Sequence, residues 1–234
     1  SPASCGRTHV HGAAVVVTCF ALVALLLCWS RWLAGRRLAA VGHLVMAIAA
    51  AAGALLMWSV MAGLESYEAV LHDQPVASLF VERTGSQSFR ATLTRLPAGR
   101  VQVFELTGDQ WRLEARTLDW RGLAAQIEPN RRYRLERLIT RATRPLSGPA
   151  AAESSFSLGT DSPNDLWTRS RTMPGWKRHV RGDHAYGPWR PLANGGLFTI
   201  WLDEGTLRVD AANAAAVAAV DPPAGARAEA PGLR

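Results

Sequence analysis

The stretch "RWLAGRR" (Arg31–Arg37) separates two long apolar runs and holds three of the four charged residues that precede Glu65; Arg7 is the fourth. Residues 12–30 and 38–64 contain no Asp, Glu, Lys or Arg. About 20 apolar residues in a helix cross the ~30 Å hydrocarbon layer of a membrane. The sequence therefore predicts an N-terminal segment over 1–12, transmembrane helices over 13–33 and 38–64, and a loop over 34–37.

The first apolar run also has features of an export signal. A signal peptide needs small residues before its cleavage site, but Trp32 occupies one of those positions. The "LLLC" at 25–28 resembles a lipoprotein box, with Leu27 where Gly, Ala or Ser is normally required. We therefore predict that this run is retained as a transmembrane helix.

Arg31, Arg36 and Arg37 predict the orientation of the helix pair, because short loops rich in Arg and Lys stay in the cytoplasm. Both termini then lie outside, and residues from 65 onward face the periplasm of a Gram-negative cell. The predicted location is the bacterial inner membrane, with the lipid bilayer as the first partner. Trp29, Trp32 and Trp58 lie near the ends of the runs, as is typical of aromatic residues at headgroup level.

The second run contains pairs of small residues with three residues between them, a spacing that lets another helix approach closely. They are Ala47, Ala49, Ala50, Ala51, Gly53 and Ala54. One interpretation is association with a second copy or with another membrane protein. The other is that these residues reflect an alanine-rich composition and that the first helix is already their partner.

Charge and cysteine content exclude some classes of protein. The part of the chain after residue 64 contains 22 of the 26 basic residues and all 19 acidic residues, so its net charge is only +3. A nucleic-acid-binding protein usually concentrates basic charge on one face, so we predict no nucleic-acid partner. Three cysteines, two of them in the first run, predict no disulfide framework.

Beyond the second run the period of the apolar residues changes. "ESYEAVLHDQP" keeps helical spacing up to Pro75, which predicts a helical stalk over 65–74. Period-2 alternation then predicts a soluble, mainly β domain over 75–220, which starts with four antiparallel strands that have one wet face. These strands are "PVASLFVER" (75–83), "SFRATLTR" (88–95), "RVQVFEL" (100–106) and "QWRLEARTLDW" (110–120), separated by glycine-containing turns. The predicted fold class is an α+β membrane protein, a transmembrane α-helical hairpin followed by a mainly antiparallel β periplasmic domain.

The rest of the domain is less regular. "RRYRLERLITRATR" (131–144) fits a helix or a strand, and we favour a strand. The turn-rich segment after it includes a short strand at Phe156 and Leu158, then a short helix from Pro163 capped by Ser162. "GGLFTIWLDEGTLRV" (195–209) predicts a hairpin, followed by an alanine-rich helix capped near Asp210 and a disordered tail over 221–234.

The segment "HVRGDHAYG" (179–187) supplies imidazole and carboxylate groups of the kinds that bind zinc or iron. His179, Asp183 and His184 are therefore weak candidate metal ligands, but their spacing fits no established motif. A turn with solvated polar side chains is the favoured interpretation. Ser147 and Ser157 lack the flanking glycines of a hydrolase elbow, and no phosphate-binding loop occurs, so we predict no enzyme activity and no cofactor.

Each of two further groups of residues can be interpreted either as a binding surface or as a structural feature. The arginines at 131, 132, 134, 137, 141 and 144 suit an anionic surface, such as lipid headgroups or the acidic face of a partner, or simply form the solvated side of a sheet. The second is the set of tryptophans at 111, 120, 167, 176, 189 and 201. These suit the floor of a ligand groove or, as we favour, the filling of a core.

Several phrases, after a two-span N-terminus, resemble a known family: "DQPVASL", "GDQWRLEARTLDWRGLA", "YRLERL" and "AYGPWRPLANGGLFTIWL". They are similar to an uncharacterised family of proteobacterial inner-membrane proteins often labelled cation or multidrug efflux proteins. The resemblance covers most of 65–220, and no functional residues carry over from it. Two spans alone cannot enclose a solute path with alternating gates. The sequence thus predicts a non-catalytic binding, assembly or accessory module of the cell envelope, with an efflux component that oligomerises or joins a larger transporter as the alternative.

Overall fold

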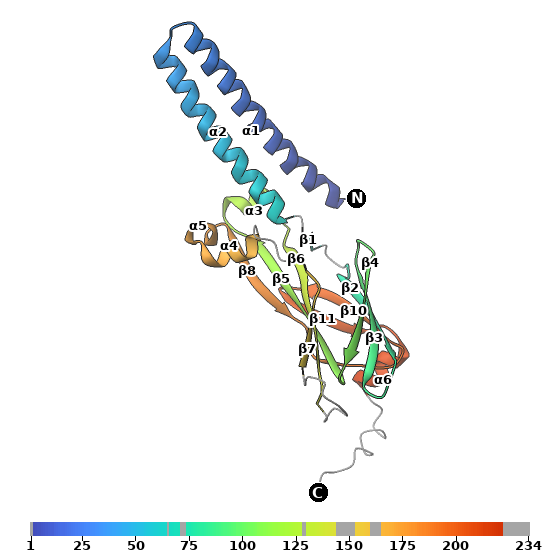
Figure 1. Ribbon diagram of the computed structural model, residues 1–234. Helices are drawn as coiled ribbons and strands as arrows, with labels where there is room; N and C mark the ends of the chain where they lie inside the picture. Colours follow the sequence, from blue (N-terminus) through green and yellow to red (C-terminus); the bar gives the residue numbers. More distant parts are fainter. Residues whose placement is uncertain are drawn as a thin grey trace. The chain divides into compact units, whose positions relative to one another are not determined.

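In a computed structural model, the chain forms two compact units (Figure 1). The structure describes residues 2–64, 66–70, 74–127, 130–143, 153–159 and 165–221. The helical unit comprises 1–67 and 161–173, and the sheet unit comprises 68–160 and 174–234. The predicted order, an apolar helix pair followed by a mainly antiparallel β domain, is confirmed.

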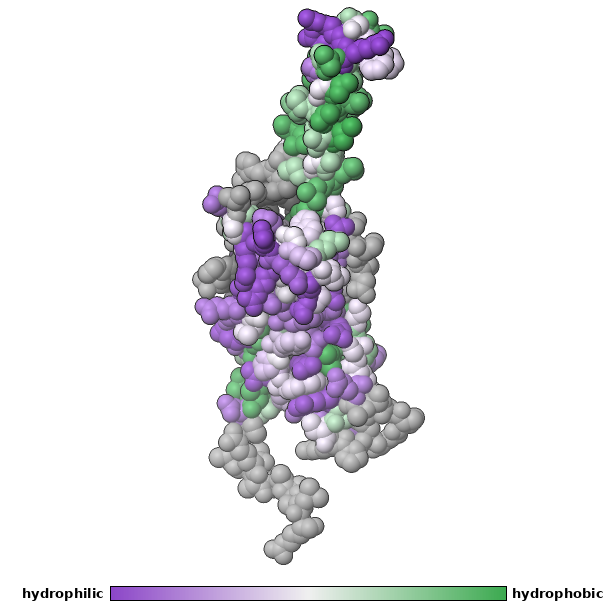
Figure 2. All heavy atoms as spheres, turned by 90° about the vertical axis from the view of Figure 1, so that its left-hand side faces the viewer, coloured by the Kyte–Doolittle hydropathy of each residue, from purple (hydrophilic) through white to green (hydrophobic). Residues whose placement is uncertain are grey.

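The helical unit contains α1 (Pro2–Leu33), α2 (Arg37–Leu64) and α4 (Leu166–Thr172). α1 and α2 form a hairpin whose turn includes Gly35 at φ +73°, a conformation that glycine adopts without strain. The buried residues of α2 that face its neighbours include Ala40, Ala47, Ala54 and Met61, spaced by seven. This spacing is typical of two helices packed along a narrow seam. Figure 2 shows apolar side chains along the pair and hydrophilic ones at its turn.

The hairpin leaves most of its large apolar side chains exposed. Val16, Phe20 and Leu26 on α1, and Ile48 and Leu55 on α2, are each more than half exposed. Both helices are long and apolar enough to cross a membrane.

The sheet unit consists of two antiparallel sheets packed face to face. One sheet, here sheet A, has the order β1-β6-β5-β8, with β7 also on β6 and β9 also on β5. Its strands are β1 (Glu68–Ala69), β5 (Gln110–Trp120), β6 (Arg132–Arg141), β7 (Glu153–Ser157), β8 (Val180–Tyr186) and β9 (Arg190–Pro191). Sheet B has the order β11-β10-β2-β3-β4. Its strands are β2 (Ala77–Arg83), β3 (Ser88–Arg95), β4 (Arg100–Thr107), β10 (Gly196–Asp203) and β11 (Thr206–Ala211).

The core lies between the inward faces of these sheets. Trp111 of β5 and Phe198 of β10 are both fully buried, and their rings meet edge to face at 5.3 Å between centroids. Around them pack inward residues of both sheets, including Leu79, Leu93 and Leu113. Short helices complete the unit: α3 (Leu123–Ile127), α5 (Pro174–Lys177) and α6 (Ala214–Val220).

The strands expected at 75–83, 88–95, 100–106 and 110–120 are confirmed as β2 to β5, but their arrangement differs from the prediction. β2, β3 and β4 are successive strands of sheet B, whereas β5 belongs to sheet A. The glycine at 108 therefore marks a crossing between sheets and not a hairpin. Val101 and Val103 are 58% and 55% exposed on the edge strand β4.

Some of the remaining predictions are confirmed and others are wrong. Residues 132–141 form a strand, and β7 and the β10–β11 hairpin are present as predicted. The helical stalk predicted over 65–74 is wrong within the described residues. α2 ends at Leu64, and Glu68–Ala69 forms strand β1, because its backbone can pair with that of β6. Asp165 caps α4, and Asn213, not Asp210, caps α6. The predicted helix start at Pro163 and its cap Ser162 lie outside the described residues. The tail predicted over 221–234 lies, from residue 222, outside the described residues.

Candidate functional site

The outward face of sheet A, where β5 lies between β6 and β8, carries many charged side chains. On β5, Arg112, Glu114 and Arg116 alternate with the inward residues of the core. Opposite them lie Arg137 and Arg134 of β6. Between Glu114 and Ala115 the pairing shifts by one residue, so that β6 contains an extra residue, Glu136. Such a bulge redirects side chains, and here it adds a second carboxylate to an arginine-rich face.

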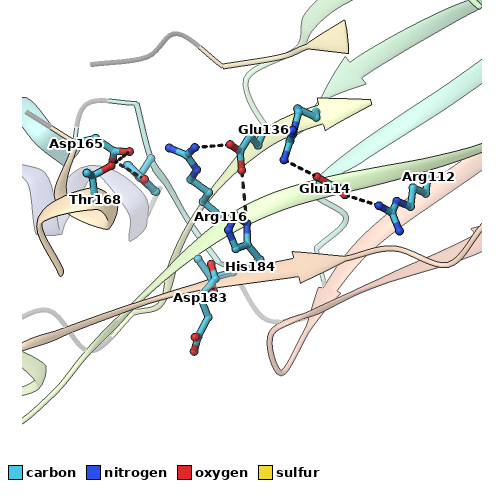
Figure 3. A network of polar contacts seen from close by, with 11 residues as sticks. Arg112, Glu114, Arg116, Glu136, Asp165, Thr168, Asp183 and His184 are labelled. Atoms are coloured by element: carbon cyan, nitrogen blue, oxygen red, sulfur yellow. Dashed lines mark hydrogen bonds and ion pairs between the residues drawn. The ribbon is translucent and has the colours of Figure 1, made fainter. Parts of the chain in front are cut away.

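Glu114 is the centre of the first ion-pair group (Figure 3). Its side chain is only 3% exposed, its Oε1 accepts from Arg112 Nη2 at 2.9 Å, and Arg137 Nη2 lies 3.2 Å from Oε2. Arg112 and Arg137 keep 28% and 46% of their side chains exposed. One buried carboxylate thus fixes two arginines that still reach solvent.

Glu136 is the centre of the second group. Arg116 Nη2 donates to Glu136 Oε1, and both side chains are largely buried. His184 of β8 lies opposite Arg116, with its Nδ1 3.7 Å from Glu136 Oε2 (Figure 3). The His184 ring stacks on Tyr186, with 5.7 Å between centroids. The second group therefore continues into an aromatic surface.

Aromatic rings extend this face past Arg112. Trp189 is contacted by two guanidinium groups, Arg141 at 4.1 Å and Arg112 at 4.7 Å from its ring centroid. Arg112 also lies 5.7 Å from the ring of Tyr186, which is 50% exposed. Stacked guanidinium groups and aromatic rings stabilise one another and hold the arginine planes in fixed orientations.

The face carries an excess of positive charge. Its outward strand residues, as the pairing registers place them, include six arginines and two glutamates. The arginines are Arg112, Arg116, Arg132, Arg134, Arg137 and Arg141, and the glutamates are Glu114 and Glu136. We call these eight residues, with His184, Tyr186 and Trp189, the arginine face. Of the arginine series predicted at 131–144, the structure gives four to this face; Arg131 pairs with Asp119 and Arg144 lies outside the described residues.

The structure does not bring the candidate metal ligands together. Residues 180–186 form β8, so Asp183 and His184 point to opposite sides of the strand, as Figure 3 also shows. Asp183 Oδ2 accepts from Arg181 Nε at 2.5 Å, while His179 lies in the turn before the strand. Within the described residues no three His, Cys, Asp or Glu side chains form a metal-binding group. The loop expected at 179–187 is therefore corrected to a strand.

The residues singled out on the helices lie as follows. Arg31, Arg36 and Arg37 flank or form the turn between α1 and α2. Ala47 and Ala54 are buried within the helical unit, and Ala50 and Gly53 are partly buried. Ala49 and Ala51 are exposed. The small residues thus fall on two sides of α2, one of which the hairpin itself covers.

A second polar cluster lies at one end of the core of the sheet unit. The hydroxyl of Tyr133 donates to Glu68 Oε2 and to the carbonyl oxygen of Leu96, at 3.1 Å each. Tyr133 is 3% exposed. Burial raises the pKa of Tyr133 well above its ordinary value, and the negative charge and hydrogen bond of Glu68 raise the pKa further. Burial also lowers the pKa of the nearby Arg95 guanidinium.

We expect Tyr133→Phe to lower the free energy of unfolding by about 1–2 kcal/mol near neutral pH, because the Glu68 carboxylate loses a donor. An unfolded tyrosine ionises near pH 10, whereas buried Tyr133 stays protonated, so the native protein loses stability as pH rises above about 10. Tyr133→Phe removes this alkaline loss in the free energy of unfolding, which amounts to at most about 1.4 kcal/mol per pH unit. Denaturant titrations of the full chain in micelles at several alkaline pH values measure both effects. Tyr186→Phe, at an exposed site, is the control and should keep the alkaline slope.

Comparisons with protein-family models, with curated proteins and with solved structures found no match to this chain.

Proposed function

We propose that the chain is a membrane-anchored, non-catalytic binding module of the bacterial cell envelope, whose sheet unit binds an acidic segment of another envelope protein through the arginine face. α1 and α2 form the anchor. Arg31, Arg36 and Arg37 keep their turn in the cytoplasm, and the sheet unit lies in the periplasm. The exposed apolar side chains of the helix pair support the anchor, because water would make this exposure costly.

The observation that carries the binding proposal is the composition of the arginine face. Arginine, tyrosine and tryptophan are the residues that most often dominate the energetics of protein interfaces. Arg112 and Arg137 are held by Glu114 yet remain 28% and 46% exposed, and Tyr186 is half exposed. Guanidinium groups held in this way match carboxylates with paired hydrogen bonds and lose little conformational entropy on binding. The partner is therefore an acidic protein segment.

The non-catalytic part of the proposal rests on how the two carboxylates are used. Glu114 and Glu136 each accept from an arginine. Carboxylate oxygens that are engaged by guanidinium groups suit a role in orienting arginines.

We expect Arg112→Gln combined with Arg137→Gln to weaken binding of a fluorescent hexaglutamate peptide by the full chain in nanodiscs at least tenfold. Each change removes a partly exposed guanidinium, and contacts to charged groups contribute about 1.5–3 kcal/mol. Fluorescence anisotropy at low ionic strength measures the dissociation constant. The control is Arg90→Gln combined with Arg208→Gln, which removes the same charge from exposed sites on sheet B. Equal weakening by both pairs would reject the arginine face as the site.

The native partner is tested by a photo-crosslinking residue, p-benzoylphenylalanine, in place of Tyr186 in living cells. The proposal requires a crosslink to an acidic envelope protein, abolished by the Arg112/Arg137 change. The same residue at Ser86, in the exposed β2–β3 turn, should not give this product.

A component of a cation or multidrug efflux system is the second candidate. It is favoured by Ala51, a small residue exposed on α2 that allows another helix to approach closely. This candidate requires Ala51→Leu to dissociate an oligomer or a transporter complex in mild detergent, while Tyr186 crosslinking stays unchanged.

A further inference from the structure

The short helix α4 is attached to the end of α2 by buried contacts within the helical unit. Asp165 caps α4: its Oδ1 accepts from the backbone N–H of Trp167 at 3.3 Å. The same oxygen accepts from the hydroxyl of Tyr67 at 2.7 Å. Tyr67 and Asp165 are 2% and 4% exposed, and Tyr67 lies three residues beyond the last residue of α2. The first turn of α4 is therefore held beside the end of α2.

Arg169 provides the contact that sets the position of α4 along α2. Its Nη1 donates to Ser59 Oγ at 2.7 Å. Ser59 lies five residues before Leu64, which is about 7.5 Å along a helix. A guanidinium group thus lies against the side of an otherwise apolar helix, inside its last two turns.

The position of Ser59 matches one boundary of the hydrocarbon layer in the proposed anchor. From Arg37, at the cytoplasmic turn, to Ser59 there are 22 residues, or about 33 Å of helix, against ~30 Å of hydrocarbon. Trp58 is adjacent, and its Nε1 lies 3.5 Å from Thr18 Oγ1 of α1. Tryptophan is enriched at this boundary. Arg169 is therefore held at headgroup level, where long basic side chains bind lipid phosphates.

The charge of the α4 region agrees with this position. Within α4 (Leu166–Thr172) the sequence has no carboxylate but two basic residues, Arg169 and Arg171. On α4, Arg171 and Thr172 are exposed, and so is Met173 after it. The Arg171 guanidinium lies 4.9 Å from the ring centroid of Trp167. Basic and aromatic side chains together are typical of a membrane-surface segment.

We propose that α4 lies on the periplasmic surface of the membrane and that Arg169 and Arg171 bind the phosphates of anionic lipid headgroups. This inference rests on the proposed membrane anchor. It makes α4 a second attachment to the bilayer, distinct from the two spans and independent of the arginine face.

Spin labels on the full chain in nanodiscs test the position of α4. In a background with Cys5, Cys19 and Cys28 changed to alanine, single labels replace Thr172, Ile48 or Ser86. Ile48 lies midway between Arg37 and Ser59 and is 61% exposed, so its label reports the anchor itself. We expect the Thr172 label to have the oxygen and nickel-chelate accessibility of the headgroup layer, with Ile48 deep in hydrocarbon and Ser86 in water. A Thr172 label in water beside a deep Ile48 label overturns the inference alone, whereas an Ile48 label in water overturns the anchor as well.

Lipid specificity is tested by titrating phosphatidylglycerol into the delipidated full chain and counting bound lipids by native mass spectrometry. We expect Arg169→Gln combined with Arg171→Gln to reduce retained phosphatidylglycerol at least fivefold and to leave retained phosphatidylcholine unchanged. The control is again Arg90→Gln combined with Arg208→Gln, on the sheet unit. Unchanged phosphatidylglycerol in the α4 variant, or equal loss in the control, overturns lipid binding by α4. A depth measurement repeated on the α4 variant verifies that the anchor is still inserted.

Discussion

Phe198→Ala is expected to lower the free energy of unfolding of the sheet unit by about 4 kcal/mol. Phe198 is fully buried on β10, which lies between β11 and β2 in sheet B. Its ring meets that of Trp111, on sheet A, edge to face at 5.3 Å. Loss of the ring leaves a cavity between two sheets whose backbones are fixed by hydrogen bonds, so the site cannot collapse fully. The aromatic contact, worth about 1 kcal/mol, is lost as well.

The effect is measured by denaturant titration of the full chain in micelles, followed by near-ultraviolet circular dichroism, which reports the packing of aromatic side chains such as Trp111. Val103→Ala is the matched control, because it also shortens an apolar side chain of sheet B but at a position that is 55% exposed. We expect the control to change stability by about 0.5 kcal/mol or less. A loss below about 1 kcal/mol for Phe198→Ala would mean that Trp111 and Phe198 are not the contact that joins the sheets.

The sequence predicts most strands because their outward residues are strongly polar. On β3, Phe89, Ala91 and Leu93 alternate with Arg90, Thr92 and Thr94, and the structure buries the first three. Alternation does not identify the partner of a strand, however. The assignment of β5 to sheet A depends on its pairing with β6 and β8, which follow it in sequence by about 12 and 60 residues. Long-range pairing of this kind leaves no local signal.

β8 could not be predicted for a different reason. One face of β8 carries Val180, Gly182, His184 and Tyr186, and the other carries Arg181, Asp183 and Ala185, of which only Ala185 is buried. Neither face alternates in hydrophobicity, and the glycine and charges resemble a turn. β1 could not be predicted either, because the apolar residues around it have helical spacing and only two of its residues pair with β6. In both segments tertiary pairing outweighs local preference.

The sequence predicts the arginine face only in part. An arginine-rich strand and several tryptophans are evident in the sequence, but which charges neutralise one another depends on register. Glu114 meets Arg137, and Glu136 faces Arg116, only because the β5–β6 pairing shifts by one residue at the bulge. Without this shift every β6 residue beyond it would face the opposite side. The bulge therefore creates the site, and no residue type in the sequence predicts it.

The crossing from sheet B to sheet A determines where β5 begins and thereby the register of this site. It consists of Gly108 and Asp109. Gly108 has φ +129°, and its N–H donates to the carbonyl oxygen of Gln87. The N–H of Asp109 donates to the carbonyl oxygen of Arg141 at 3.0 Å, and its Oδ1 accepts from the N–H of Thr143 at 2.9 Å. These bonds fix the end of β6, which carries Arg141 and its contact with Trp189.

Gly108→Ala is therefore expected to lower the free energy of unfolding by about 3 kcal/mol and to weaken hexaglutamate binding. A Cβ at this position would lie 2.6 Å from the carbonyl oxygen of Arg141, a backbone atom that the β5–β6 pairing holds in place. The backbone conformation adds about 1–3 kcal/mol of strain for a residue with a side chain. Relief of the clash moves Arg141 away from Trp189, so the two measurements should change together. Denaturant titration and peptide anisotropy on the same preparation test this.

Gly99→Ala separates the two causes. Gly99 also has a positive φ, +67°, but a Cβ there would meet no atom within 4 Å. This control carries backbone strain without a clash, and we expect it to cost about 1 kcal/mol and to leave peptide binding unchanged. If both variants lose the same stability and neither affects binding, strain alone accounts for Gly108, and the crossing does not position the arginine face. If only Gly108→Ala impairs binding, the contact between Gly108 and Arg141 couples the sheet crossing to the site.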